Sequence, residues 1–207
     1  MVTIRRTNTK ERIIKESLRL FSTHGYNAVG VEMIAAAVKV TPPSLYKHFK
    51  GKKEILDEIT GRAIKLYKER LFDINVYSDE EVEKFTLESF SDIVLKHINN
   101  VLHDEELRCV RKLCVIEQFR NEDLRALHLN RTYLGNEQAA NDLLRKILKV
   151  KNIQVDLEFN HLVKLFTLPI IATVDHCYCD PDYEKDGLEY IQAHIKYGSS
   201  LFSMGIV

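Results

Sequence analysis

The chain has 207 residues and carries 30 lysine and arginine residues against 30 aspartate and glutamate residues, so its formal net charge is zero. This length suffices for one domain or two small ones with a sizeable core. No run of eighteen apolar residues occurs, and residues 1–10 are polar and basic. We therefore expect neither a membrane-spanning protein nor a secreted one, and a cytoplasmic location.

The charges are unevenly distributed along the chain. Residues 1–53 contain 11 basic and 3 acidic side chains, whereas residues 54–207 contain 19 basic and 27 acidic ones. Such an asymmetry is expected when one end of a protein meets a polyanion and the other does not. The basic segment is therefore a candidate for nucleic-acid binding.

Apolar periodicity predicts helices almost throughout, and no alternating strand pattern competes with it. The first helix is expected over about residues 10–23. Residues 31–56 then predict two short helices joined by a tight turn. Ile34 and Leu45 take buried positions there, and the small Ala35 lies where the two helices would cross. This spacing is typical of a helix-turn-helix.

Two prolines mark the start of the second short helix. Thr41 can cap this helix, and Pro42 and Pro43 fall in its first turn, where their missing N–H groups would have no helical partner. A residue that precedes proline is pushed out of the helical region, so Pro42 lies either inside the helix or just before it.

Longer helices are expected in the acidic half. Residues 55–71 form one apolar stripe with Gly61 in its middle, which suggests either a hinge or close packing against a neighbour. Further helices are expected over residues 78–102, 104–119, 123–150, 156–179 and 183–204. The last two are apolar on more than one side, which indicates either a partner surface or a central place in the core.

A set of residue identities lies at the end of the first helix and in the helix-turn-helix: Phe21, Gly25, Tyr26, Ile34, Ala35, Leu45, Tyr46, Phe49, Lys52, Glu54 and Leu56. On these residues the segment 9–56 resembles the TetR family of transcriptional repressors. Residues 116–121 also look like a segment of some family members. Two positions depart from the family pattern, because Lys39 replaces the usual turn glycine and Gly30 replaces the usual threonine or serine.

The resemblance implies an all-α protein with an N-terminal three-helix helix-turn-helix DNA-binding domain over residues 1–53. A larger helical domain over residues 54–207 would bind an effector and dimerise through its last two helices. A two-fold dimer presents two reading helices to a palindrome. The implied partners are double-stranded operator DNA, a small-molecule effector of unknown identity and a second copy of the chain, without a membrane or a cofactor.

Base contacts are expected from the second short helix. Its exposed positions, carried over from the resemblance, are Pro42, Pro43, Ser44, Lys47 and His48. Lys47 can donate to guanine O6 or N7, and Pro43 can pack on a thymine methyl group. His48 faces either the groove or the first helix.

Phosphate contacts are expected from the flanking residues Thr41, Tyr46 and Lys52, because such contacts set register without reading sequence. Arg6 lies on an arm before the first helix, which either enters a minor groove or makes no contact. The predicted DNA-binding set is completed by Gly30 and Val31.

The acidic half contains the candidate effector site. Glu117, Gln118 and Arg120 lie on one predicted helix, where they either fix a ligand in an apolar pocket or form interhelical salt bridges. The residues expected to bind the effector are Tyr67, Phe90, Val94, Gln118, Phe119, Phe166 and Ile170.

Neither a metal site nor a catalytic site is expected. Cys177 and Cys179 fall on different faces of a helix, which disfavours a zinc site over residues 175–180. The four cysteines are expected to be reduced thiols. No glycine-rich phosphate loop and no local signature of a catalytic serine, histidine and aspartate occurs in the sequence.

The sequence thus predicts a DNA-binding transcriptional regulator, a repressor released from a palindromic operator by a small molecule. Two alternatives stay open. One is a helical enzyme or metal-binding protein whose basic N-terminal segment is incidental, and the other is a DNA-binding protein without an effector. A large apolar cavity in the acidic half would separate the repressor from the second alternative.

Overall fold

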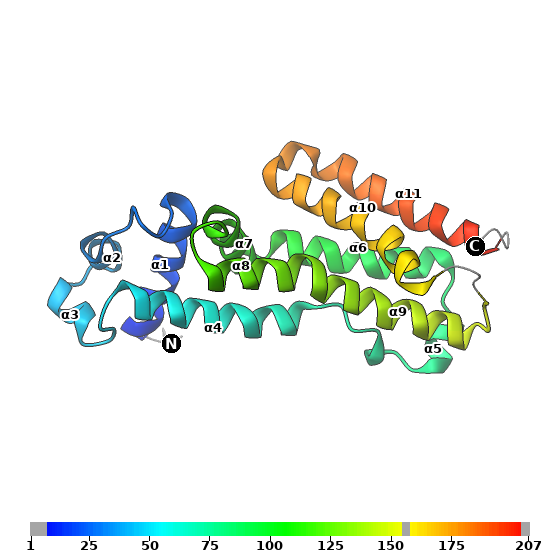
Figure 1. Ribbon diagram of the computed structural model, residues 1–207, viewed down its shortest axis with the longest axis horizontal. Helices are drawn as coiled ribbons and strands as arrows, with labels where there is room; N and C mark the ends of the chain where they lie inside the picture. The colour runs from blue at the N-terminus through cyan, green and yellow to red at the C-terminus, as the bar shows by residue number, and fades with distance from the viewer. Residues whose placement is uncertain (1–7, 155–157, 204–207) are drawn as a thin grey trace, which may run out of the picture. The chain divides into compact units, whose positions relative to one another are not determined.

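The computed structural model describes residues 8–154 and 158–203, and every regular element within them is a helix (Figure 1). The predicted all-α class is confirmed. The chain folds as two compact units, of which unit 1 comprises residues 1–69 and 105–129 and unit 2 comprises residues 70–104 and 130–207. These are units of packing, and the functional division near residue 53 stays a prediction.

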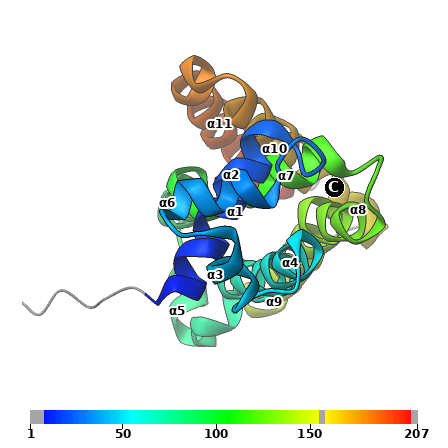
Figure 2. The same ribbon diagram turned by 90° about the vertical axis from the view of Figure 1, so that its left-hand side faces the viewer.

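Unit 1 is assembled around its first helix. Its elements are α1 (Thr9–His24), α2 (Val31–Val38), α3 (Pro42–Tyr46), α4 (Lys52–Arg70), α7 (Glu105–Glu117) and α8 (Glu122–Leu129), where the last residue of α4 already counts with unit 2. Figure 2 looks toward α1, α2 and α3. α1 packs against both α2 and α7, and α7 packs against α8. A helix from the acidic half thus belongs to the core of unit 1.

The ends of α1 are set by local side-chain chemistry. The Asn8 side chain accepts a hydrogen bond from the Lys10 N–H at 3.1 Å and so caps the N-terminus. Gly25 ends the helix at φ 80°, a conformation that costs glycine little and other residues more, and its N–H donates to the Phe21 carbonyl at 2.9 Å. Ile13 and Phe21 are completely buried on the inner face.

The helix-turn-helix has the predicted form. Ile34, Ala35 and Leu45 are buried, as the spacing required. Lys39 adopts the left-handed conformation at φ 59° and ψ 47°, so a lysine occupies the turn position that favours glycine. α3 begins at Pro42, which answers the question that the sequence left open. Thr41 holds the N-cap position with extended backbone, and its hydroxyl accepts no capping hydrogen bond from the described residues.

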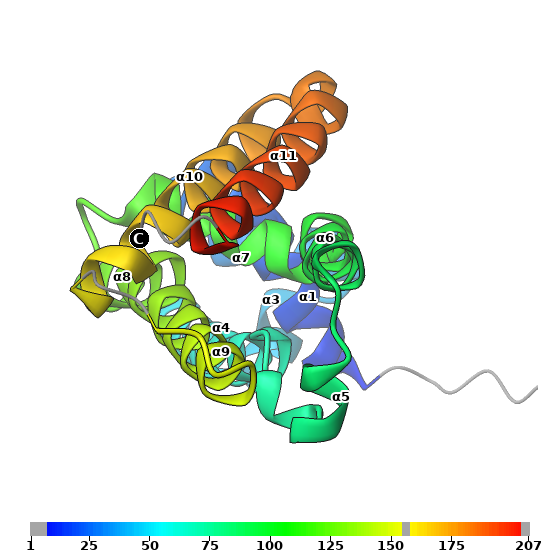
Figure 3. The same cartoon turned by 90° about the vertical axis from the view of Figure 1, so that its right-hand side faces the viewer.

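Unit 2 is a bundle of longer helices. Its elements are η1 (Ile74–Val76), α5 (Asp79–Glu83), α6 (Leu87–His103), the π-helical turn η2 (Asn130–Gly135), α9 (Asn136–Val150), α10 (Phe159–Cys179), η3 (Pro181–Tyr183) and α11 (Glu184–Ser203). α10 and α11 run side by side (Figure 3), and α6 packs against both. The core includes Phe90, Ile98, Leu162, Ile191 and Ile195.

The single helix expected over residues 78–102 is wrong. The chain forms α5 and α6 instead, because a second capping box starts at Thr86. The Thr86 hydroxyl accepts from the Ser89 N–H at 3.1 Å, and the Ser89 hydroxyl accepts from the Thr86 N–H at 2.9 Å. This reciprocal pair satisfies two N–H groups at a helix start and favours a new helix at Leu87.

The expectation of one helix over residues 123–150 is also only partly right. The segment is helical, but the π-helical turn η2 interrupts it between α8 and α9. Gly135 ends this turn, and a Cβ at this position would lie 3.1 Å from the Asn130 carbonyl oxygen. The small residue therefore permits the tight backbone approach within the wide turn.

α10 is, within the part of the chain that the structure describes, the one helix long and apolar enough to cross a membrane by length and composition. The core helix of a globular protein passes the same test. Leu162 and Phe166 of α10 are buried in the core of unit 2, and α9 and α11 pack on this helix. The core of unit 2 thus accounts for part of its apolar surface.

None of the four cysteines, all of which lie in the described part of the chain, forms a disulfide, which agrees with the expectation of thiols. Cys177 is buried and Cys179 is exposed, so the two fall on different sides of α10, as predicted. Cys114 is buried in unit 1, and Cys109 is half-buried. Burial raises the pKa of the Cys177 thiol, with a smaller contribution from the Glu184 carboxylate, and this environment favours the inert protonated form.

Candidate nucleic-acid interface

α3 presents a polar and basic surface around one buried anchor. Leu45 is fully buried, whereas Pro43, Tyr46, Lys47 and His48 are exposed. His48 is thus exposed, which favours the first of its two predicted positions over burial against α1. An exposed proline on a helix of this type and an exposed lysine at its C-cap can meet a thymine methyl group and a guanine edge.

The remaining predicted contact residues lie in α3, at its N-cap and at the start of α2. Thr41 is exposed, and Pro42 and Ser44 are half-buried. Gly30 is the N-cap of α2, and Val31 is its first residue. Arg6 lies outside the described residues.

Gly30 lacks a side chain that could cap α2, and the Glu32 carboxylate occupies the space beside it. A Cβ at Gly30 would lie 3.0 Å from Glu32 Oε2. Glu32 is exposed in the first turn of α2, where a negative charge favours the helix dipole. The same negative charge repels a phosphate at this N-terminus. Gly30 and Val31 have no charged side chain, so they can offer a phosphate only their backbone N–H groups.

Lys52 has a structural partner that its sequence position did not reveal. Its Nζ donates to the Tyr26 carbonyl at 2.7 Å and lies 4.3 Å from the centroid of the Tyr26 ring. The ammonium group therefore ties the start of α4 to the turn after α1. Two further N–H donors of the ammonium group stay available for a phosphate.

Glu117 also contacts this turn, which neither interpretation of the sequence anticipated. Its Oε1 accepts a hydrogen bond from the Tyr26 N–H at 2.8 Å, and its side chain is 2% exposed. The carboxylate is therefore used inside unit 1 as a cap for a loop of the helix-turn-helix domain. Ninety-one positions separate the two residues, and no local pattern links them.

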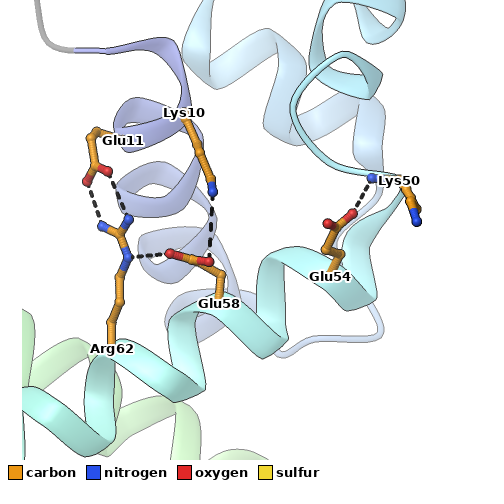
Figure 4. A network of polar contacts seen from close by, with 6 residues as sticks. All are labelled: Lys10, Glu11, Lys50, Glu54, Glu58 and Arg62. Atoms are coloured by element: carbon orange, nitrogen blue, oxygen red, sulfur yellow. Dashed lines mark hydrogen bonds and ion pairs between the residues drawn. The ribbon is translucent and has the colours of Figure 1, made fainter.

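Ion pairs link α4 to α1, and a backbone-to-side-chain hydrogen bond links the loop before α4 to its first turn (Figure 4). Arg62 donates to both Glu11 oxygens, at 2.6 and 2.8 Å, and to Glu58 at 2.9 Å. Glu58 also lies 3.9 Å from Lys10. At the start of α4, Glu54 accepts from the Lys50 N–H at 2.5 Å. The network links α4 to α1 through partly exposed side chains.

The predicted effector-binding residues fall into two groups. Phe90 and Phe166 belong to the buried core of unit 2, and Val94 and Ile170 are partly buried against this core. Tyr67, Gln118 and Phe119 lie in unit 1, where Tyr67 is buried and Phe119 is 87% exposed. The first group is the part of the set that the structure brings together, and the complete pocket stays a prediction.

The helix-turn-helix is shared with known proteins. Residues 13–59 match the sequence profile of the family described as bacterial regulatory proteins, tetR family. The HTH-type transcriptional regulator TcmR of Streptomyces glaucescens is 43% identical over 47 residues, which are 23% of this chain and 21% of TcmR. The uncharacterized regulator YerO of Bacillus subtilis is 43% identical over 47 residues, 16% of its length. The match thus spans about a fifth or less of these relatives.

The fold is shared along nearly the whole chain. A putative TetR-family regulator from Mesorhizobium loti has a TM-score of 0.66 at 14% identity, over 93% of this chain and 96% of that one. SmeT, the repressor of the Stenotrophomonas maltophilia multidrug efflux pump SmeDEF, has a TM-score of 0.60 at 18% identity, over 92% of this chain and 90% of SmeT. The structure of SmeT in complex with triclosan has a TM-score of 0.64 at 16% identity, over 91% of this chain and 90% of that one.

The short helices, their basic exposed face and the turn between them are typical of a helix-turn-helix DNA-binding domain. The sequence profile covers this domain, and the fold of TetR-family regulators covers more than nine-tenths of the chain. Residues 13–59 therefore match the helix-turn-helix domain of the TetR family, within a chain that shares the fold of TetR-family regulators.

Proposed function

We propose that this protein is a homodimeric repressor that binds a palindromic operator with α3 and leaves it when a small molecule binds. The observation that carries the proposal is the exposure of Pro43 in α3 and of Lys47 at its C-cap, around the buried anchor Leu45. A protein of this kind regulates transcription in the cytoplasm and has no need of catalysis.

Dimerisation through α10 and α11 is supported by the apolar side chains that these helices leave uncovered. Leu165 and Leu168 of α10 and Tyr190 and Tyr197 of α11 are exposed in the single chain. Large apolar residues gathered on adjoining helices are typical of protein interfaces. A two-fold dimer would carry two copies of α3 and require half-sites about one helical turn apart, or a multiple of that distance.

Release by a small molecule is supported by the fold and by one relative. SmeT, which shares the fold, is known in complex with triclosan. In this chain the aromatic and aliphatic residues Phe90, Val94, Phe166 and Ile170 lie together in unit 2, which is the composition that an apolar ligand requires. A DNA-binding protein without an effector is the second candidate.

The decisive experiment is the selection of bound sequences from a random pool of double-stranded DNA by the full-length protein. A repressor of this type recovers one palindrome, and sedimentation shows a dimer at micromolar concentration. A monomer that recovers no common sequence contradicts the proposal. Screening apolar compounds for release of the recovered DNA separates the two candidates, because a protein without an effector is released by none of them.

A further inference from the structure

Glu117 at the end of α7 is a buried carboxylate without a role in DNA reading or in a ligand pocket. Glutamate is among the residues least often buried, because the loss of hydration is unfavourable unless hydrogen bonds replace it. Here the side chain is 2% exposed, and Oε1 accepts from the Tyr26 N–H at 2.8 Å. The contact joins α7 to the loop that connects α1 with α2.

The backbone of Tyr26 is held by hydrogen bonds from two different helices, and its ring packs on a third. Its N–H donates to Glu117 of α7, and its carbonyl accepts from Lys52 of α4 at 2.7 Å. The Tyr26 ring also packs edge-on against Phe21 of α1, with 5.3 Å between ring centroids. A residue restrained by three helices in this way fixes the direction in which the chain leaves α1.

The loop is shaped to admit the carboxylate. Gly25 has φ 80°, and a Cβ there would lie 3.1 Å from Glu117 Oε1. The glycine thus supplies both the backbone conformation and the space that the hydrogen bond needs. The chain continues from Tyr26 into α2 at Val31 and then through the Lys39 turn into α3. The place of α3 therefore depends on this loop.

We propose that Glu117 is a positioning residue for operator binding, which holds the loop after α1 and, through α2, the reading helix α3. The inference rests on the proposed function. According to this inference α7 is a second helix, besides α4, whose displacement would be passed on to the reading helix α3. Arg70 directly follows the first segment of unit 1, and Asp104 directly precedes the second. The two residues form an ion pair, in which Arg70 Nε donates to Asp104 at 3.2 Å.

The test uses the full-length protein and the DNA sequence that it selects. Operator affinity and random-DNA affinity are measured by fluorescence anisotropy for the wild type, Glu117→Ala and Glu117→Gln, at a temperature where circular dichroism shows each to be folded. Glu117→Ala should lose at least about tenfold in operator affinity and less than about threefold on random DNA. Glu117→Gln should stay within about threefold, because its amide oxygen accepts the same N–H.

The matched control is Glu106→Ala, which removes an exposed carboxylate from the same helix and should leave both affinities unchanged. If Glu117→Ala does not fold, Glu117→Asp takes its place, because the shorter side chain keeps the charge but withdraws from Tyr26. A folded Ala or Asp variant with wild-type operator affinity overturns the inference. Equal losses on operator and random DNA, or a Gln variant as weak as Ala, overturn it too.

The outcome for the wild type separates this inference from the function on which it rests. A wild-type protein that selects no DNA sequence overturns both. A wild-type protein that selects a palindrome, with variants at Glu117 that bind it equally well, overturns the positioning role alone.

Discussion

Arg62 of α4 and Glu11 of α1 form a two-pronged ion pair, with N···O distances of 2.6 and 2.8 Å. A guanidinium group matches a carboxylate in this planar arrangement, which makes the pair stronger than a single contact. The hydrogen bond from Arg62 lowers the pKa of Glu11 below its ordinary value. The pair therefore links the stability of unit 1 to pH.

The first prediction concerns the ion pair between Arg62 and Glu11. Both side chains are partly exposed, at 37% and 48%, so Arg62→Leu should lower the free energy of unfolding by only about 0.5–1 kcal/mol at pH 7. A carboxylate with a lowered folded-state pKa stabilises the fold above its unfolded-state pKa and loses this effect as the pH falls through the folded-state value. The loss should therefore shrink in acid, as urea denaturation at several pH values can show.

A matched variant on the same helix is Lys65→Leu, whose exposed partner Glu69 lies 3.9 Å away. Its effect at pH 7 should be too small to measure. Equal losses from the two substitutions, or an Arg62→Leu loss that persists in acid, would exclude the assigned role.

The second prediction concerns the turn between α2 and α3. Lys39 stands at φ 59° and ψ 47°, where a Cβ is unfavourable, so Lys39→Gly should raise the free energy of unfolding by about 0.5–1 kcal/mol. Lys39→Ala keeps the Cβ and serves as the control, because it removes the charge without relieving the backbone. Thermal melts distinguish them. A glycine variant no more stable than the alanine variant would be evidence against strain at this turn.

The third prediction concerns Gly61 of α4. A Cβ at Gly61 meets nothing within 4 Å, which contradicts close packing as the reason for a glycine at this position. Gly61→Ala should therefore raise the free energy of unfolding by about 0.5–1 kcal/mol, because alanine favours the helix. Lys68→Ala, another exposed site of α4, should change it by less than about 0.3 kcal/mol.

If Gly61 is instead kept as a hinge, the alanine variant should also show a smaller effector-induced change in operator affinity. Melting and operator binding, each with and without a releasing compound, measure both effects. A destabilised variant with unchanged release would refute the hinge.

The fourth prediction concerns His97 in unit 2, which packs edge-on against Phe72 with 5.5 Å between ring centroids. Burial lowers the pKa of His97, and the charge of Arg131 adds to the effect. The folded protein thus binds this proton less readily than the unfolded chain, so stability is full at neutral pH and falls as the pH drops below the ordinary histidine value.

His97→Phe should flatten this decline, because it keeps an aromatic ring and removes the titration. The exposed His161→Gln is the control and should leave the pH profile unchanged. Denaturant titrations at pH 7 and pH 5 provide the comparison. The same decline in the wild type and in His97→Phe would show that another group is responsible.

The sequence allowed the helix-turn-helix to be predicted because its determinants are local. Ile34, Ala35 and Leu45 follow a spacing that predicts their burial, and Pro42 and Pro43 suit the first turn of a helix. The break before α6 was missed because Thr86 and Ser89 form a capping box with serine in the place of the usual glutamate. That signal is weak in sequence.

The contacts around Tyr26 could not be predicted, because they join residues far apart in the chain. Lys52 is basic and close to the reading helix, so a phosphate contact was the natural expectation, whereas its carbonyl partner appears only in the fold. Glu117 belongs by sequence to the acidic half and by packing to unit 1. Periodicity identifies which face of a helix is buried, but not against which partner.

The fifth prediction separates base reading from phosphate binding. Lys47→Ala should lower operator affinity by about 1–3 kcal/mol and leave random-DNA affinity nearly unchanged, because exposed Lys47 is placed to donate to a base. Lys52→Ala should weaken binding to both kinds of DNA and also lower stability, since Lys52 holds the Tyr26 carbonyl.

The most direct measurement is the affinity of the wild type, Lys47→Ala and Lys52→Ala for the selected operator and for a shuffled duplex of equal composition, at one salt concentration. For the wild type we expect the operator to be bound at least about a thousandfold more tightly, with Lys47→Ala reducing this ratio more than Lys52→Ala does. A wild-type protein that binds both duplexes equally, or a ratio that Lys47→Ala leaves unchanged, would contradict the account.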